Sequence, residues 1–181
     1  FFQGFTKIDY LSVKPSSVLI WLGLSVLTFI FIQYSQRWGT WDAWTVWNYH
    51  AKFMALSDNF LLMQEGTSFT SPDYPLFLPS VIAIIWKSIG STTPLIPIVV
   101  AYIITLSVVL TVVSAFKKSI NNTFGIIALA ILLLDGSFIK QGAWQYADTL
   151  LSLFLLISIV LSQFTNKEDK NILVVFIVGL F

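Results

Sequence analysis

The chain has 181 residues, of which 56% are hydrophobic and only 10% are charged, and its formal net charge is +1. A soluble domain carries about 25% charged residues, so this composition is typical of a membrane protein. The near-zero charge, without a basic cluster, argues against nucleic acid as a partner. The absence of cysteine excludes disulfides and zinc–thiolate sites, and a single histidine disfavours a histidine-based triad.

The hydrophobic segments predict an all-α, polytopic transmembrane protein whose main partner is the lipid bilayer. A membrane-spanning helix needs about 20 mostly apolar residues. The predicted spans cover about residues 17–35, 94–116, 122–139 and 148–164, and the third is interrupted by Asp135-Gly136. A fifth hydrophobic segment, 171–181, stops short of that length, so we expect the chain to be the amino-terminal part of a longer protein.

A polar and aromatic stretch, residues 38–79, holds four of the seven tryptophans and the only histidine. It belongs to a predicted external loop, residues 36–93. Within this loop we expect an interfacial helix at about 41–57, capped by Thr40. At 3.6 residues per turn, Trp41 and Trp44 share one face with Asn48, Ala51 and Ala55.

A second apolar helix is predicted at about 74–89. It is short for a span and contains Pro75 and Pro79, so we expect it to be interfacial or re-entrant. Charge placement supports this interpretation. With a cytoplasmic amino terminus and no crossing at 74–89, six of the ten lysines and arginines are cytoplasmic, as the positive-inside rule prefers. These six are Lys7, Lys14, Lys117, Lys118, Lys167 and Lys170.

Five acids fall on the external side of this topology, namely Asp42, Asp58, Glu65, Asp73 and Asp148, and three of them have two interpretations each. Asp42 is either a first-turn acid that stabilises a helix dipole or a general base among aromatic rings that hold a sugar. Asp148 opens a predicted span and is likewise a first-turn acid or a catalytic group. Asp73 precedes Tyr74-Pro75 and either caps the second loop helix or contributes to a site.

Two further polar residues have local explanations. Asp135 lies near the outer end of a predicted span, where a pair with Lys140 accounts for it better than a function does. His50 is a structural or interfacial residue or, as the alternative, a catalytic one. No phosphate-binding glycine loop and no closely spaced set of metal ligands is present in the sequence.

Three motifs together resemble the GT-C superfamily of integral-membrane glycosyltransferases, which use polyprenyl-phosphate sugars. They are Trp41-Asp42-Ala43-Trp44 with Trp47-Asn48, then Asp73-Tyr74-Pro75-Leu76, then Gln145-Tyr146-Ala147-Asp148-Thr149-Leu150. Their order and the predicted topology are similar to those of protein O-mannosyltransferases and the aminoarabinose transferase of lipid A.

The resemblance implies sugar transfer from a polyprenyl-phosphate donor on the periplasmic side of the inner membrane. It implies that Asp42 activates the acceptor, that Asp148 lies at the mouth of the same cavity, and that Asp73 lies near the lipid phosphate. The acceptor, whether lipid, glycan or protein, stays open. The expected substrate-binding residues are Trp41, Trp44, His50, Lys52, Asp73, Tyr74 and Tyr146.

The chain also departs from the pattern. Many relatives have Asp-Glu in the first loop, whereas Ala43 follows Asp42 here, and a lone carboxylate is a poor site for a divalent cation. We therefore assign no cofactor, and dependence on a divalent cation stays an open alternative. Some relatives have a lysine where Tyr74 stands, so the phosphate would be bound by another basic residue. The candidates are Arg37, Lys52, Lys87 and Lys140.

Two other functions are compatible with the sequence. A non-catalytic membrane subunit would dock into an envelope complex through its aromatic surface. A transporter would place polar groups near the bilayer midplane on broken helices, whereas the acids here are predicted at one surface. We expect the glycosyltransferase in preference to both.

Overall fold

The computed structural model describes residues 14–57, 71 and 73–164. The predicted hydrophobic segment 171–181 lies outside the described residues. Regular secondary structure in the described part of the chain is helical throughout. The helices are α1 (Pro15–Tyr34), a π-helical turn η1 (Ala43–Trp47), α2 (Asn48–Leu56), α4 (Phe77–Ile89), α5 (Leu95–Ser119), α6 (Asn122–Leu134), α7 (Gly136–Ala143) and α8 (Asp148–Phe164).

Two helices are long and apolar enough to cross a membrane, namely α1 with 20 residues and α5 with 25. A third span is added if α6 and α7, which are bent by 69° at their junction, are counted as one. Helix α8 is apolar but shorter, at 17 residues. The all-helical prediction is confirmed for the described residues, and the two or three candidate spans support a membrane protein.

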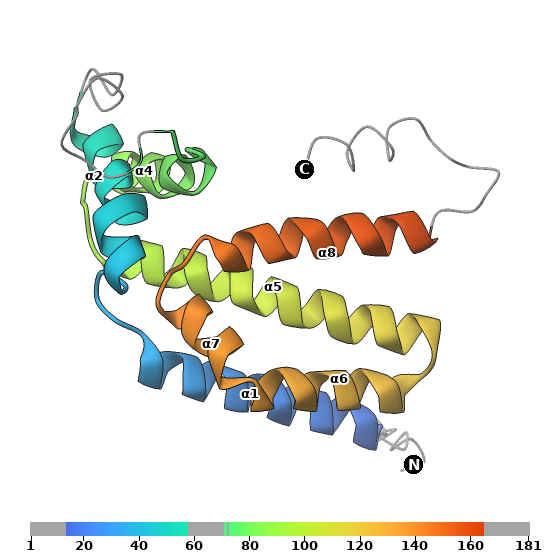
Figure 1. Cartoon of the computed structure of the whole chain (residues 1–181). Helices are drawn as coiled ribbons and strands as arrows, with labels where there is room; N and C mark the ends of the chain where they lie inside the picture. Colours follow the sequence, from blue (N-terminus) through green and yellow to red (C-terminus); the bar gives the residue numbers. More distant parts are fainter. Residues whose placement is uncertain (1–13, 58–70, 72, 165–181) are drawn as a thin grey trace, which may run out of the picture.

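The long helices form one group and the two loop helices another (Figure 1). Helix α5 packs against α6 and α8, and α1 packs against α6 and α7. Helices α2 and α4 pack on each other, and α4 also contacts α5. The loop helices are therefore held at one end of α5, next to the start of α8.

The core between α1, α5, α6 and α7 is aliphatic. Its buried residues are Leu27, Val109, Val113, Leu129 and Ile139. Gly23 of α1 lies against the Leu129 side chain so closely that a Cβ atom there would clash. This close approach lets α1 pack on α6 although most of the large apolar residues of α1 stay exposed, as suits a surface that faces lipid.

The predicted span 122–139 is bent by 69° at Asp135, where the sequence predicts an interruption. The Asp135 carboxylate accepts hydrogen bonds from the backbone N–H groups of Ser137 and Phe138, at 3.0 and 3.3 Å. It thereby caps α7, which leaves the axis of α6. The predicted pair with Lys140 is not formed, because the Lys140 ammonium lies over the Tyr34 ring, 5.2 Å from its centroid.

The second loop helix also starts later than predicted. Helix α4 begins at Phe77 after an N-cap at Leu76, and no side chain caps it. Asp73 is therefore not its cap. Within α4, Trp86 is buried against α2 and α5, and its indole N–H donates to the Thr93 carbonyl at 2.8 Å.

Candidate functional site

The first loop helix runs from Trp41 to Leu56 but contains the π-helical turn η1. A π-turn takes more residues per turn than an α-helix and is common near functional sites. Trp41 and Trp44 are 72% and 58% exposed, whereas Asn48 and Ala51 are buried. The predicted face is therefore uneven in burial: its two tryptophans are exposed, whereas Asn48 and Ala51 are buried.

The start of this helix is held by the backbone. The Trp44 N–H donates to the Thr40 carbonyl at 2.8 Å. The Thr40 hydroxyl is buried and has no hydrogen-bond partner among the described residues, so the predicted side-chain cap is wrong. Asp42 is exposed in the first turn, where the helix dipole favours a carboxylate.

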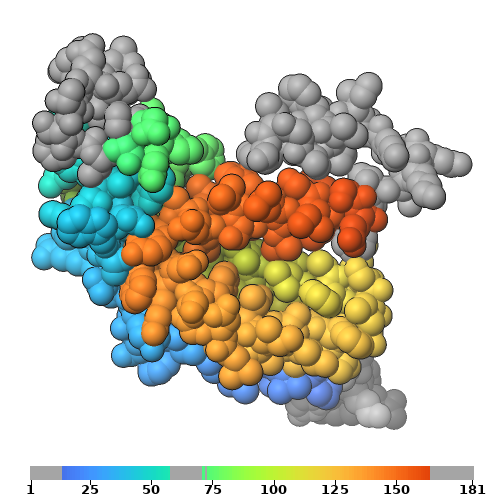
Figure 2. Space-filling view, viewed as in Figure 1, coloured from blue at the N-terminus to red at the C-terminus, as the bar shows by residue number. Residues whose placement is uncertain are grey.

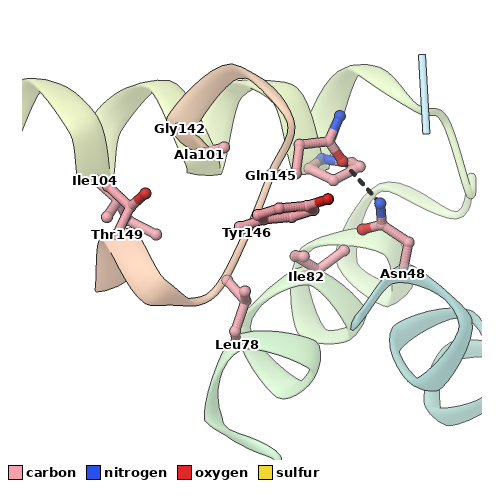
Figure 3. Close-up of a pocket in the computed structure, with 10 residues that line it drawn as sticks. Asn48, Leu78, Ile82, Ala101, Ile104, Gly142, Gln145, Tyr146 and Thr149 are labelled. Carbon is pink, nitrogen blue, oxygen red and sulfur yellow. Dashed lines mark hydrogen bonds between the residues drawn. The ribbon is translucent and has the colours of Figure 1, made fainter. Parts of the chain in front are cut away.

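Two buried amides join this helix to the connector between α7 and α8. The Asn48 Nδ2 group donates to the Trp38 carbonyl at 2.8 Å and to Gln145 Oε1 at 2.7 Å. The Gln145 Nε2 group donates in turn to the Gln36 carbonyl at 2.8 Å. Figure 3 shows the Asn48–Gln145 bond, which joins side chains that are 3% and 4% exposed. We call Asn48 and Gln145 the amide junction.

Backbone geometry strengthens this junction. Gln145 has φ +65° and Gly39 has φ +74°, both in the left-handed region. A Cβ atom on Gly39 would clash with the Trp144 carbonyl and with Ala43, so glycine is required there. The Thr40 N–H also donates to the Trp144 carbonyl, at 3.3 Å. The junction therefore fixes the first loop helix relative to the start of α8.

A small cavity lies beside the junction (Figure 3). Its volume is about 10 Å³, which is enough for one water molecule. Asn48 Oδ1 and Thr149 Oγ1 are buried and have no hydrogen-bond partner among the described residues, and both residues line the cavity. Tyr146 lines it as well. The cavity is too small for a substrate.

A larger groove opens on the other side of the connector, with a volume of about 300 Å³. Ligand pockets typically have volumes of about 300–1,000 Å³, so the groove can hold a small molecule or part of a chain. Its walls come from η1, the segment before α4, the start of α4 and the start of α8; in Figure 2 the green surface of the α4 region borders the orange surface of α8. The lining residues are Trp47, Tyr74, Pro75, Phe77, Leu78, Ala147, Asp148, Leu150, Leu151 and Phe154.

Aromatic pairs shape this groove. The Trp47 and Tyr74 rings stack with centroids 5.4 Å apart, and Phe77 meets Phe154 edge to face at 5.7 Å. Asp148 is the one charged residue of the lining, and it forms no ion pair within the part of the chain that the structure describes. The groove is therefore almost entirely apolar, and its lining includes one acidic residue, Asp148, and one tyrosine, Tyr74.

Of the predicted site residues, the structure brings Asp148 and Tyr74 together in the groove. Tyr146 instead lines the small cavity. The groove lining does not include the remaining predicted residues, which are Trp41, Asp42, Trp44, His50, Lys52 and Asp73. The catalytic role predicted for Asp42 is not tested by this placement and stays a prediction.

The predicted binding residues outside the groove contact neighbouring rings, are buried, or are exposed to solvent. Trp41 and Trp44 form a tilted ring pair with centroids 6.2 Å apart. The Lys52 ammonium lies 5.6 Å from the Trp38 ring. His50 is fully buried, and Asp73 is exposed. Among the described residues, no group of three or more histidine, aspartate or glutamate side chains is placed to hold a metal ion.

Sequence reasoning missed the residues that build this region. Asn48, Gln145, Trp47, Phe77 and Phe154 were not predicted as site residues, although the first three lie inside the quoted motifs. The sequence did contain a signal for the two amides. A buried amide needs a hydrogen-bond partner, so Asn48 and Gln145, both in largely apolar surroundings, could have been predicted to bond to each other.

Comparison of the chain with protein-family models, with curated proteins and with solved structures finds no match. The described residues themselves indicate an α-helical membrane protein, with two or three candidate spans and an apolar groove whose lining includes Asp148.

Proposed function

We propose that the chain belongs to a multi-pass glycosyltransferase of the inner membrane. It moves a sugar from a polyprenyl-phosphate donor to an acceptor on the periplasmic side, and its amino terminus is cytoplasmic. The groove carries the proposal. It combines apolar and aromatic walls, suited to a lipid-linked substrate, with the Asp148 carboxylate, suited to a substrate hydroxyl.

The amide junction supplies a second argument. Two of the motifs behind the resemblance, Trp47-Asn48 and Gln145-Tyr146-Ala147-Asp148, are joined by the Asn48–Gln145 hydrogen bond. This hydrogen bond holds the two motifs side by side, so Trp47 and Asp148 line the same groove. Catalysis needs such fixed placement, since small misplacements of reacting groups are costly.

The reaction is an inverting displacement at the anomeric carbon. A carboxylate takes the proton of the acceptor hydroxyl, the hydroxyl oxygen bonds to the anomeric carbon, and the polyprenyl phosphate leaves with the electron pair of the old bond. Asp42 is the proposed base and Asp148 the carboxylate that orients the substrate. Basic side chains such as Arg37 and Lys52 stabilise the phosphate charge.

The test is transfer in membranes that contain the full-length protein, supplied with a panel of polyprenyl-phosphate hexoses and pentoses that carry radiolabelled sugars. Because a general base contributes about 10²–10⁴-fold, Asp42→Asn should lower transfer by at least about 100-fold. Asp148→Asn should also lower it strongly.

The matched control is Asp135→Asn, which changes another exposed carboxylate and keeps an efficient helix cap. It should leave transfer unchanged. Full turnover in the Asp42→Asn and Asp148→Asn proteins, at normal protein levels, would refute the proposal.

A second function is favoured by one observation, the exposed pair of Trp41 and Trp44. Such a pair suits a membrane subunit that docks on a partner through aromatic contacts. In that case the double variant Asp42→Asn/Asp148→Asn is tolerated, whereas Trp41→Ala/Trp44→Ala releases the chain from its complex. Co-purification of both variants distinguishes the two functions.

A further inference from the structure

The groove is continuous with the outward apolar face of α8. Leu151, Leu155 and Ile159 follow one another at helical spacing and are 54%, 51% and 56% exposed. Leu151 also lines the groove. A lipid chain that lies beside Leu151 in a bilayer can therefore enter the groove from the side, without passing through water.

The polar groups of the groove select the head group of such a molecule. Asp148 supplies a negative charge that no described side chain neutralises, and the Tyr74 hydroxyl supplies a hydrogen-bond donor. A purely anionic head group is repelled by the carboxylate. A zwitterionic head group fits both, with an ammonium group on Asp148 and a phosphate oxygen that accepts from Tyr74.

We infer that the groove binds one membrane lipid, with its chain between the aromatic walls and its ammonium head group on Asp148. The walls suit an alkyl chain, because the Trp47–Tyr74 stack and the Phe77–Phe154 pair present apolar ring surface. The inference is separate from the proposed transfer reaction: the groove holds either this lipid or the donor, so the two compete for it, and lipid binding is measured without a donor sugar.

The experiment is photolabelling of the full-length protein in lipid nanodiscs. Two lipids with identical diazirine-bearing chains are compared, phosphatidylethanolamine and phosphatidic acid, and labelled peptides are identified by mass spectrometry. The groove peptides around Trp47, Tyr74 and Phe154 should be labelled about threefold to fivefold more by phosphatidylethanolamine, as expected for one partly exposed ion pair.

Two matched variants of α8 test the place of binding. Leu151→Trp fills the groove, whereas Leu155→Trp adds the same side chain one turn further along an equally exposed face. Labelling of the Tyr74 peptide should fall several-fold in the first variant and stay unchanged in the second. Because both positions are about half exposed, neither change disturbs the core.

Two further variants test the head group. Asp148→Asn should make the two lipids label equally while labelling itself persists, and Asp148→Glu should keep the preference. Equal labelling by both lipids in the unmodified protein would overturn the ammonium assignment. Labelling that ignores Leu151→Trp, or labelling absent from the groove peptides, would overturn the site. Success here with no sugar transfer would reject only the proposed enzyme.

Discussion

The amide junction and the groove adjoin each other but treat polar groups in opposite ways. In the junction, Asn48 and Gln145 are almost fully buried and bond to each other and to backbone carbonyls. In the groove, Asp148 and Tyr74 are exposed along apolar walls. The junction uses its polar groups to fix the fold, whereas the groove leaves them available to a ligand. Substitutions in the first should therefore affect stability, and those in the second should affect binding.

The largest expected effect on stability is in the junction. Gln145→Leu leaves Asn48 and the Gln36 carbonyl without their partner in a buried place. We expect the free energy of unfolding to fall by about 2–4 kcal/mol, measured by chemical denaturation in detergent micelles. Gln141→Leu changes an exposed glutamine of α7 and should cost less than about 0.5 kcal/mol. Equal losses in the two proteins would show that the junction does not fix the fold.

The packing behind the junction gives the next effect. A Cβ atom on Gly142 would clash with the Thr105 side chain of α5, whereas one on Gly136 meets no atom. Gly142→Ala should destabilise the protein by about 1–3 kcal/mol, and Gly136→Ala should be neutral or stabilising by about 0.5–1 kcal/mol. The two effects are compared by the midpoint temperatures of thermal unfolding of the Gly142→Ala and Gly136→Ala proteins.

Adding Thr105→Ala removes the hydroxyl that a Cβ atom at Gly142 meets most closely. The double variant should therefore recover much of the loss caused by Gly142→Ala. A loss that Thr105→Ala leaves untouched would mean that the close approach of α7 and α5 is not the cause.

The smallest effect concerns the break between α6 and α7. Asp135→Ala removes two hydrogen bonds to backbone N–H groups and should cost about 1 kcal/mol, whereas Asp135→Asn should be nearly neutral. Helix content by circular dichroism and the unfolding midpoint measure both. If Asp135→Ala were as stable as the unmodified protein, the cap would not explain the bend.

The long helices were the most predictable part of the chain. The apolar segments at 17–35 and 94–116 correspond closely to α1 and α5, because length and hydrophobicity alone define such helices. The interruption at Asp135-Gly136 was predicted from the sequence, but the 69° bend between α6 and α7 was not. The Asp135 carboxylate accepts hydrogen bonds from two backbone N–H groups and so starts a new helix, α7. The length of a hydrophobic segment does not predict such a cap.

The site was predictable only in part. The motifs pointed to Asp148 and Tyr74, which do share a groove. Helical spacing did not predict the burial along the first loop helix, where Trp44 is exposed and Asn48 is buried. Phe154 could not be found, because its role depends on the packing of α8 beside α4 rather than on any local pattern.

The most direct test of the account is the rate of sugar transfer by the Leu151→Trp and Leu155→Trp proteins, measured with the same radiolabelled donors. If the groove is the functional site, Leu151→Trp lowers the rate by at least about tenfold, equivalent to about 1.4 kcal/mol of barrier, and Leu155→Trp leaves it unchanged. Equal rates for the two proteins would contradict the assignment of function to this groove.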